Sequence, residues 1–154
     1  MRRFLPILLF VLLSFFVGYV SMLLQQDALQ GWYPSLIKSS LTPPGIVFSI
    51  VWGVLYLLMG ISAGIVWNMR TVYSWVLAVL FFVQLALNLL WSLCFFYLQS
   101  PLLGFVVLVV FFMVLAVYVA GCYKQSRMSA LLNIPYLLWL LFAGYLNFYI
   151  VLYN

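Results

Sequence analysis

Apolar residues along the chain form five long blocks, and the segments between the blocks are polar. The blocks cover residues 4–24, 45–67, 72–98, 102–123 and 128–153. Each has at least the roughly 20 residues that a helix needs to cross a bilayer, and a helix satisfies its own backbone groups in lipid. The pattern predicts an all-α membrane protein, with residues 1–154 as a single five-transmembrane-helix bundle and residues 25–44 as its one long loop.

Composition supports this class. The chain is 69% hydrophobic and 5% charged, whereas a typical soluble domain is about a quarter charged. The pair Arg2-Arg3 before the first block also fits the start of a signal peptide. The apolar run that follows is longer than a typical signal-peptide core, and no clear cleavage site follows it. We therefore interpret the first block as a true span.

Basic residues lie almost entirely on one side of the predicted bundle. That side carries Arg2, Arg3, Arg70, Lys124 and Arg127, and the other side carries only Lys38. Because cytoplasmic loops are enriched in Lys and Arg, we expect the N-terminus in the cytoplasm and the C-terminus outside. The basic residues then act as topology signals and headgroup contacts, so we expect membrane lipid and no nucleic acid among the partners.

Several kinds of chemistry are excluded by residues that the chain lacks. It has no histidine, and Asp27 is its only carboxylate side chain. This excludes most metal sites, a Ser-His-Asp triad, paired carboxylates and the usual proton relay of a coupled pump. We expect no metal and no obligatory cofactor.

Aromatic and polar side chains form a stripe on each of three predicted helices. The stripes are Trp52, Tyr56, Met59 and Ala63; Asn88, Trp91 and Phe95; and Tyr136, Trp139, Ala143 and Asn147. Counted from the long-loop end, Trp52, Asn88 and Ala143 lie about 12–15 Å deep. Three stripes at similar depth could line one cavity that opens toward the long loop. Asn88 and Asn147 need partners inside the membrane, and both a ligand and neighbouring helices remain open as partners.

Gly60 and Gly64 form a GxxxG motif on the second predicted span. Small residues at this spacing allow two helices to approach closely. The contact could lie within the bundle or between subunits.

The order and spacing of several motifs are similar to those of a known family. The motifs are Trp32-Tyr33, Lys38, Thr42-Pro43-Pro44-Gly45, Val51-Trp52, Leu55-Tyr56, Gly60, Ser62-Ala63, Gln84 to Asn88, Trp91, Phe95-Phe96 and Pro135 to Asn147. From Trp32 to its end the chain resembles the TspO/MBR family. This family includes the tryptophan-rich sensory proteins of bacteria and the mitochondrial translocator protein, also called the peripheral-type benzodiazepine receptor. The first span resembles the family mainly in length.

The resemblance implies a ligand and a set of contact residues. Family members form five-helix bundles, usually homodimers, and bind porphyrins and, in some cases, cholesterol or benzodiazepine-site ligands. The resemblance places the ligand under the first long loop, in contact with Trp52, Asn88, Trp91, Trp139, Phe142, Ala143 and Asn147, with Tyr33 in the lid. The aromatic stripes add Tyr56 and Phe95 to the expected contact residues. With no histidine as axial haem ligand, we expect metal-free protoporphyrin IX, and we expect the cell membrane of a bacterium as location.

Two departures from the family pattern bear on the ligand. Ser39 and Leu41 stand where a proline and a tryptophan are expected, which could loosen the lid or remove an aromatic wall. The tail from Leu146 to Asn154 lacks the terminal base of the proposed sterol pattern. That pattern is weak in itself, so sterol remains an open partner.

Three functions follow as hypotheses. The first is a porphyrin-binding sensor or carrier, with residues 25–44 as the lid and Pro43-Pro44 starting the second helix. The second is light-dependent porphyrin breakdown, for which Trp52 and Trp139 match the positions implicated in bacterial relatives. The third is a translocator of sterols or other small lipophilic molecules.

Overall fold

The computed structural model describes residues 4–154, and nearly all of them are helical. The long helices are α1 (Phe4–Gln30), α3 (Gly45–Asn68), α4 (Val72–Ser92), α5 (Pro101–Gln125) and α6 (Arg127–Tyr153), and the short ones are α2 (Trp32–Ser35) and the π-helical turn η1 (Leu93–Tyr97). Each long helix, with η1 continuing α4, is long and apolar enough to cross a membrane. The predicted all-α bundle of five spans is confirmed, and the chain is an integral membrane protein.

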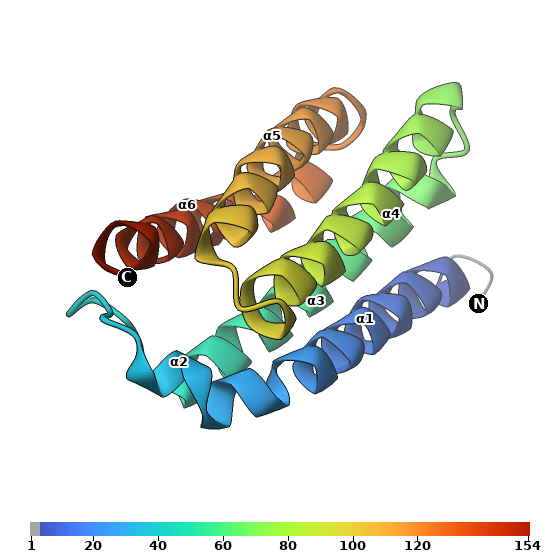
Figure 1. The fold of residues 1–154 in the computed structure, drawn as a ribbon. Helices are drawn as coiled ribbons and strands as arrows, with labels where there is room; N and C mark the ends of the chain where they lie inside the picture. The colour runs from blue at the N-terminus through green and yellow to red at the C-terminus, as the bar shows by residue number, and fades with distance from the viewer. Residues whose placement is uncertain (1–3) are drawn as a thin grey trace.

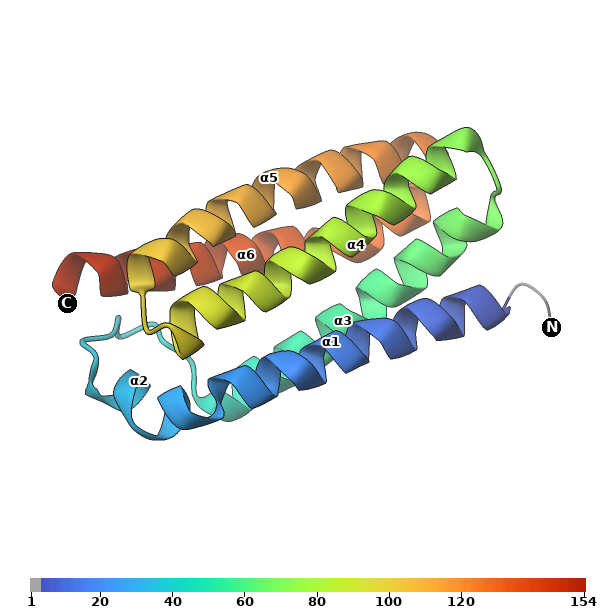
Figure 2. The ribbon, with the colours of Figure 1, turned by 45° about the vertical axis from the view of Figure 1, so that its right-hand side comes forward.

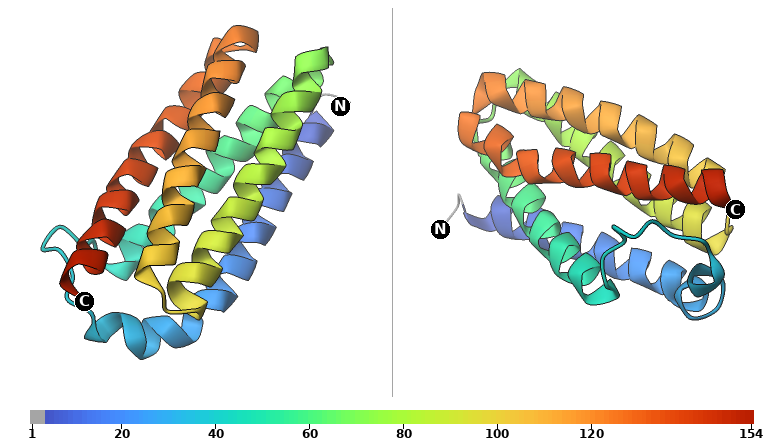
Figure 3. Two further views of the ribbon diagram at one scale, coloured as in Figure 1. Left: turned by 45° about the horizontal axis from the view of Figure 1, so that its top comes forward. Right: turned by 90° about the vertical axis from the view of Figure 1, so that its left-hand side faces the viewer.

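The five long helices run side by side, and the start of α1 and the end of α6 lie at opposite ends of the bundle (Figures 1 and 2). Around the bundle the helices follow the order α1, α3, α6, α5, α4, and Figure 3 shows α5 and α6 together on one side. The interior is largely apolar, with Phe81, Phe111 and Leu115 fully buried. We call α2 and residues 36–44 the lid, and the end of the bundle that they cover the lid end.

The helix bounds follow the apolar blocks closely, except in α1. With η1 counted as the end of α4, the other four helices begin and end within two residues of the predicted blocks. In contrast, α1 continues to Gln30, six residues past its predicted end at Leu24. Hydropathy falls at Gln25, but no glycine or proline interrupts the chain before Gly31, so the helix continues beyond the apolar layer. Residues 25–30 therefore belong to α1, and the non-helical part of the long loop is shorter than expected.

Gly60 and Gly64 pack against α1 of the same chain. A Cβ atom at Gly60 would lie 2.5 Å from Cα of Val11, and one at Gly64 would overlap the backbone of Ile7. The two glycines thus let α1 and α3 touch backbone to backbone in the half of the bundle away from the lid. Of the two contacts that the motif allowed, the structure has the one within the bundle.

Lys38 stabilises the conformation of the lid. Its ammonium group donates to the carbonyl oxygens of Tyr33, Pro34 and Leu36 at 2.8, 3.1 and 3.2 Å, and it lies 5.0 Å from the centre of the Tyr33 ring. A lysine that binds the last carbonyls of a helix caps it. The side chain therefore serves α2 and is not free at the cavity mouth.

Two contacts tie the lid to α6. The Asn154 amide binds both backbone groups of Ile37, accepting from the nitrogen at 2.9 Å and donating to the oxygen at 3.1 Å. The Ser39 hydroxyl lies 3.1 Å from the Tyr145 hydroxyl and is buried. Ser39, one of the two departures from the family pattern, is thus an anchor of the lid. Leu41, the other, is exposed and forms no wall.

Candidate ligand-binding cavity

A cavity of about 440 Å³ lies beneath the lid, between α1, α3 and the lid end of α4. Tyr33 and Pro43 line it from the lid, and Trp52, Asn88 and Trp91 line it from α3 and α4. Its volume falls in the range of about 300–1,000 Å³ that is typical of small-molecule sites. Among the described residues, none of those that line the cavity carries a charge.

Stacked aromatic rings form one wall of the cavity. Trp52 stacks on Tyr56 with ring centroids 5.5 Å apart and on Trp91 at 6.1 Å. Trp91 stacks in turn on Phe95 at 5.9 Å. The rings come from two helices because Trp52 and Tyr56 follow one face of α3, while Trp91 and Phe95 lie where α4 becomes the wider turn η1. The wall offers flat π faces to a ligand.

Asn88 forms a polar point in this aromatic surface. Its Oδ1 accepts hydrogen bonds from the Tyr56 hydroxyl at 2.9 Å and from the Ser21 hydroxyl at 3.1 Å. Its Nδ2 has no hydrogen-bond partner in the described chain, although Asn88 is only 1% exposed. The oxygen is therefore satisfied by protein, and the amide nitrogen remains as a buried donor.

Five of the ten predicted contact residues line the cavity, namely Tyr33, Tyr56, Trp52, Asn88 and Trp91. Phe95 lies behind this surface, packed against Trp91 and the lid residues Trp32 and Tyr33. It supports the wall and the lid without lining the cavity.

The four predicted contact residues on α6 lie outside the lining. Trp139 packs against Phe48 at 5.3 Å and against Phe142 at 5.6 Å, and Phe48 in turn lines the cavity. Asn147 joins α6 to neighbouring helices, because its Oδ1 accepts from Nε1 of Trp91 at 3.4 Å and its Nδ2 donates to the carbonyl of Pro101 at 2.8 Å. Ala143 is buried. Neighbouring helices thus supply the partners of Asn147.

The third wall comes from α1, which carries none of the predicted aromatic stripes. Its lining residues are Phe15, Gly18, Tyr19, Ser21, Met22, Gln25 and Leu29. Gly18 allows close approach, because a Cβ atom there would overlap the Tyr56 ring. Gln25 donates to the Ser92 hydroxyl at 2.9 Å. The spacing of Gly18, Ser21 and Gln25, small or polar residues at i, i+3 and i+7 in an apolar helix, was the signal that could have identified this face.

The cavity opens sideways between α1 and the first turns of α3. Tyr19 and Met22 are 56% and 48% exposed although they line the cavity. Gly45 and Ser49, at the start of α3, are also exposed and line it. Because the lid covers the end of the bundle, the cavity mouth opens on the lateral surface of the bundle, which would face membrane lipid.

Burial also affects the lid residue Tyr33. Desolvation raises the pKa of Tyr33 above its ordinary value of 10.0. Its ring packs against Phe96 at 5.7 Å, and the phenol is a neutral group at physiological pH. The lid therefore presents an uncharged aromatic surface to the cavity.

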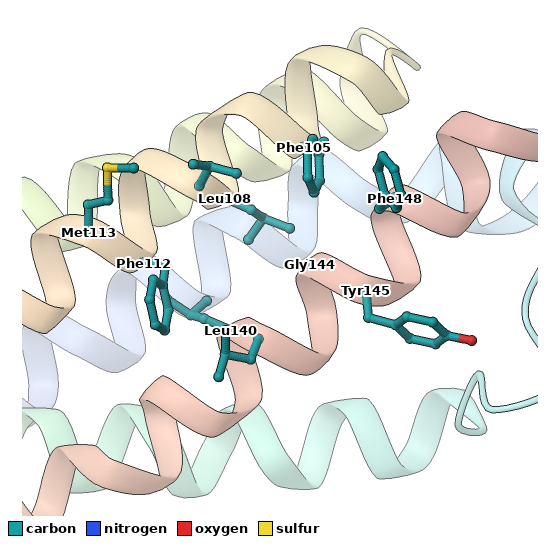
Figure 4. Close-up of a pocket in the computed structure, with 10 residues that line it drawn as sticks. Phe105, Leu108, Phe112, Met113, Leu140, Gly144, Tyr145 and Phe148 are labelled. Atoms are coloured by element: carbon teal, nitrogen blue, oxygen red, sulfur yellow. The ribbon is translucent and has the colours of Figure 1, made fainter.

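A second hollow of about 340 Å³ lies on the outer surface between α5 and α6. Its lining is apolar, with Phe105 and Phe148 5.1 Å apart, and Figure 4 shows the two rings side by side while the hydroxyl of Tyr145 points away from them. It has no convergent polar groups, so we place the candidate site in the aromatic cavity.

Comparison with known proteins agrees with the motifs. The sequence pattern of the TspO/MBR family matches residues 10–153. The chain is 38% identical over 138 residues to the tryptophan-rich protein TspO of Archaeoglobus fulgidus, covering 90% of each protein. It is 35% identical over 157 residues to the tryptophan-rich protein TspO of Chlorobaculum tepidum, covering 99% of this chain and 98% of the relative.

An animal relative shows similarity over a somewhat shorter stretch. The chain is 36% identical over 120 residues to the translocator protein of Sus scrofa, covering 76% of this chain and 71% of that protein. The match of the family pattern over nearly the whole chain confirms the resemblance, and the chain belongs to the TspO/MBR family.

Proposed function

We propose that the chain binds a porphyrin in the aromatic cavity and acts as a membrane receptor or carrier for it. The observation that carries the proposal is the stack of Tyr56, Trp52 and Trp91 along a cavity of about 440 Å³. A flat, π-rich macrocycle gains about 0.5–1.5 kcal/mol per ring contact beyond the burial of its area. Family membership supports small lipophilic ligands in general.

The polar groups of the site suit one orientation of the ligand. The free Nδ2 of Asn88 donates to an acceptor on the macrocycle, such as an unprotonated ring nitrogen. Because no charged residue of the described chain lines the cavity, burial of the two porphyrin carboxylates would be costly. They therefore point toward the open side, where water and headgroups solvate them. Lys38 is occupied by the carbonyl groups of α2 and does not bind them.

The proposal is tested by titrating the detergent-solubilised protein with protoporphyrin IX and following the porphyrin Soret band. Trp52→Leu removes the central ring of the stack and is expected to weaken binding about tenfold, from the loss of about 1.4 kcal/mol. Trp75→Leu is the matched control, because Trp75 is 66% exposed and lies at the other end of the bundle. Equal affinities for Trp52→Leu and the wild type would refute the proposal.

Light-dependent breakdown of the bound porphyrin is a second candidate. The observation that favours it is that Trp52, an oxidisable ring, lines the cavity in a continuous stack. Illumination of the aerobic complex should then bleach the Soret band faster than porphyrin in detergent alone, and Trp52→Phe should abolish the difference. Trp139→Phe should have a smaller effect, because Phe48 separates Trp139 from the lining. Equal bleaching with and without protein excludes catalysis.

The homodimer and sterol binding stay predictions. The GxxxG motif that could have served a dimer contacts α1 instead, so a second copy would have to use another face. Cross-linking in native membranes tests the dimer, and competition of a sterol with protoporphyrin IX tests whether sterol shares the cavity.

A further inference from the structure

A second group of polar residues is buried far from the lid. It comprises Ser62 of α3, Tyr118 and Cys122 of α5, and Ser129 and Asn133 of α6. Tyr118 is 1% exposed and the other four are 0% exposed. None of them lines the aromatic cavity or the hollow between α5 and α6. The group, which we call the buried polar cluster, therefore has no part in the site described above.

Part of the cluster is bonded within the protein. Nδ2 of Asn133 donates to the Ser62 hydroxyl at 2.7 Å and to the carbonyl of Ser129 at 2.8 Å. The Ser62 hydroxyl donates to the same carbonyl at 3.0 Å. These bonds join α3 to α6 and use the donors of both side chains.

Three polar atoms of the cluster remain without a hydrogen-bond partner among residues 4–154. They are Oδ1 of Asn133, Oγ of Ser129 and the hydroxyl oxygen of Tyr118. The Tyr118 hydroxyl lies near Ser62 and Cys122, but without the geometry of a hydrogen bond. Leaving a buried polar group unpaired destabilises the folded protein, and surrounding lipid offers such a group no partner.

We propose that the buried polar cluster is a binding site for ordered water. Ser129 and Asn133 are one helical turn apart on the same face of α6. Tyr118 of α5 lies near Ser62, which bonds to Asn133 and to the Ser129 carbonyl. Water has two donors and two acceptors, so it can donate to Oδ1 of Asn133 and accept from either hydroxyl. Buried waters typically make about three such bonds.

Other occupants fit the three atoms less well. An apolar molecule would leave all of them unpaired. A cation would meet only neutral oxygen atoms, because the cluster contains no carboxylate, and its charge would stay uncompensated inside the membrane. Water satisfies the atoms without adding charge, and it would link α5 to α6.

Radiolytic hydroxyl-radical footprinting of the wild-type protein in liposomes tests the proposal directly, because bound water generates radicals next to the side chains it touches. We expect oxidation of Tyr118 several-fold above that of Phe111. Phe111 is the matched control, since it is a fully buried ring on the same helix and has similar intrinsic reactivity. Equal oxidation of the two rings would overturn the proposal.

Substitution of Tyr118 gives a second test, because the melting temperature should change in opposite directions depending on whether water is bound. If water is bound, Tyr118→Phe removes one of its partners and should lower the melting temperature by about 2–4 °C, which corresponds to roughly 1 kcal/mol. If the site is dry, the same change removes an unpaired hydroxyl and raises the melting temperature, which would contradict the proposal. Asn133→Leu should lower Tyr118 oxidation to the Phe111 level, and unchanged oxidation in the folded variant would count against the site.

Discussion

The Tyr56 hydroxyl donates a 2.9 Å hydrogen bond to Oδ1 of Asn88, and this bond decides which end of the amide is available in the cavity. Ser21 donates to the same oxygen at 3.1 Å. With both hydroxyls donating to the oxygen, the NH₂ group of Asn88 is left without a protein partner. In this arrangement Asn88 offers a donor, and a ligand that supplies an acceptor satisfies it.

Asn88→Leu should weaken the binding of protoporphyrin IX by a factor of about 2–10, the value of one hydrogen bond. The Soret titration gives the dissociation constant. Asn133→Leu is the control, because it removes the same type of side chain outside the cavity lining. A dissociation constant for Asn88→Leu equal to that of the wild type would show that the amide does not bind the ligand.

Gly60→Leu should destabilise the bundle. Its side chain would meet the backbone of Val11, which cannot move aside as a flexible side chain can, so we expect a loss of about 1–3 kcal/mol or more. Gly53→Ala is the control on the same helix, because no heavy atom lies within 4 Å of its Cβ position, and it should gain about 0.5–1 kcal/mol. Thermal unfolding in detergent measures both, and equal melting temperatures would contradict the close α1–α3 contact.

Gly53→Phe should block the cavity while leaving the fold intact. Gly53 lines the cavity, and a side chain there meets open space. We expect porphyrin affinity to fall at least tenfold with a melting temperature near that of Gly53→Ala. If the variant binds porphyrin as the wild type does, the ligand occupies a different site.

Loss of the lid contacts should loosen the lid without unfolding the bundle. Asn154→Ala removes both bonds to Ile37, and Lys38→Met removes three bonds to carbonyl groups. Hydrogen exchange should speed up in residues 32–44 and stay unchanged in α5. Porphyrin affinity should depend little on salt, because Lys38 is engaged within the lid. A steep salt dependence that Lys38→Met removes would instead place the lysine on the ligand.

The contribution of Tyr33 to the lid should not change between pH 7 and pH 9. Burial raises its pKa above 10.0, so the folded protein favours the protonated phenol. The associated stability is fully present below pH 10 and is lost only as the pH rises through the raised pKa. Porphyrin affinity of the wild type and of Tyr33→Phe should therefore show the same pH profile in this range. Profiles that differ below pH 9 would contradict the prediction that the Tyr33 phenol stays protonated.

The sequence determined the number of membrane-spanning helices, most of their ends and five of the residues that line the candidate site. Hydropathy places spans because lipid excludes unpaired backbone groups, and Pro43-Pro44-Gly45 marks the start of α3, where the structure has Pro44 as N-cap. Trp52, Asn88 and Trp91 stood out because indole and amide groups are unusual deep in apolar helices. They do line one cavity.

Only the tertiary structure decided which helix forms the third wall. The aromatic stripe of α6 suggested that helix, but Trp139 lies behind Phe48 and Asn147 bonds to its neighbours. Gly18 of α1, which the motifs did not include, instead brings that helix against Tyr56. In a membrane-spanning helix most residues on every face are apolar, so hydropathy alone does not distinguish inward from outward faces. Which face of a helix points into the bundle depends on where small residues let two helices approach closely. Such a contact depends on the side chains of both helices.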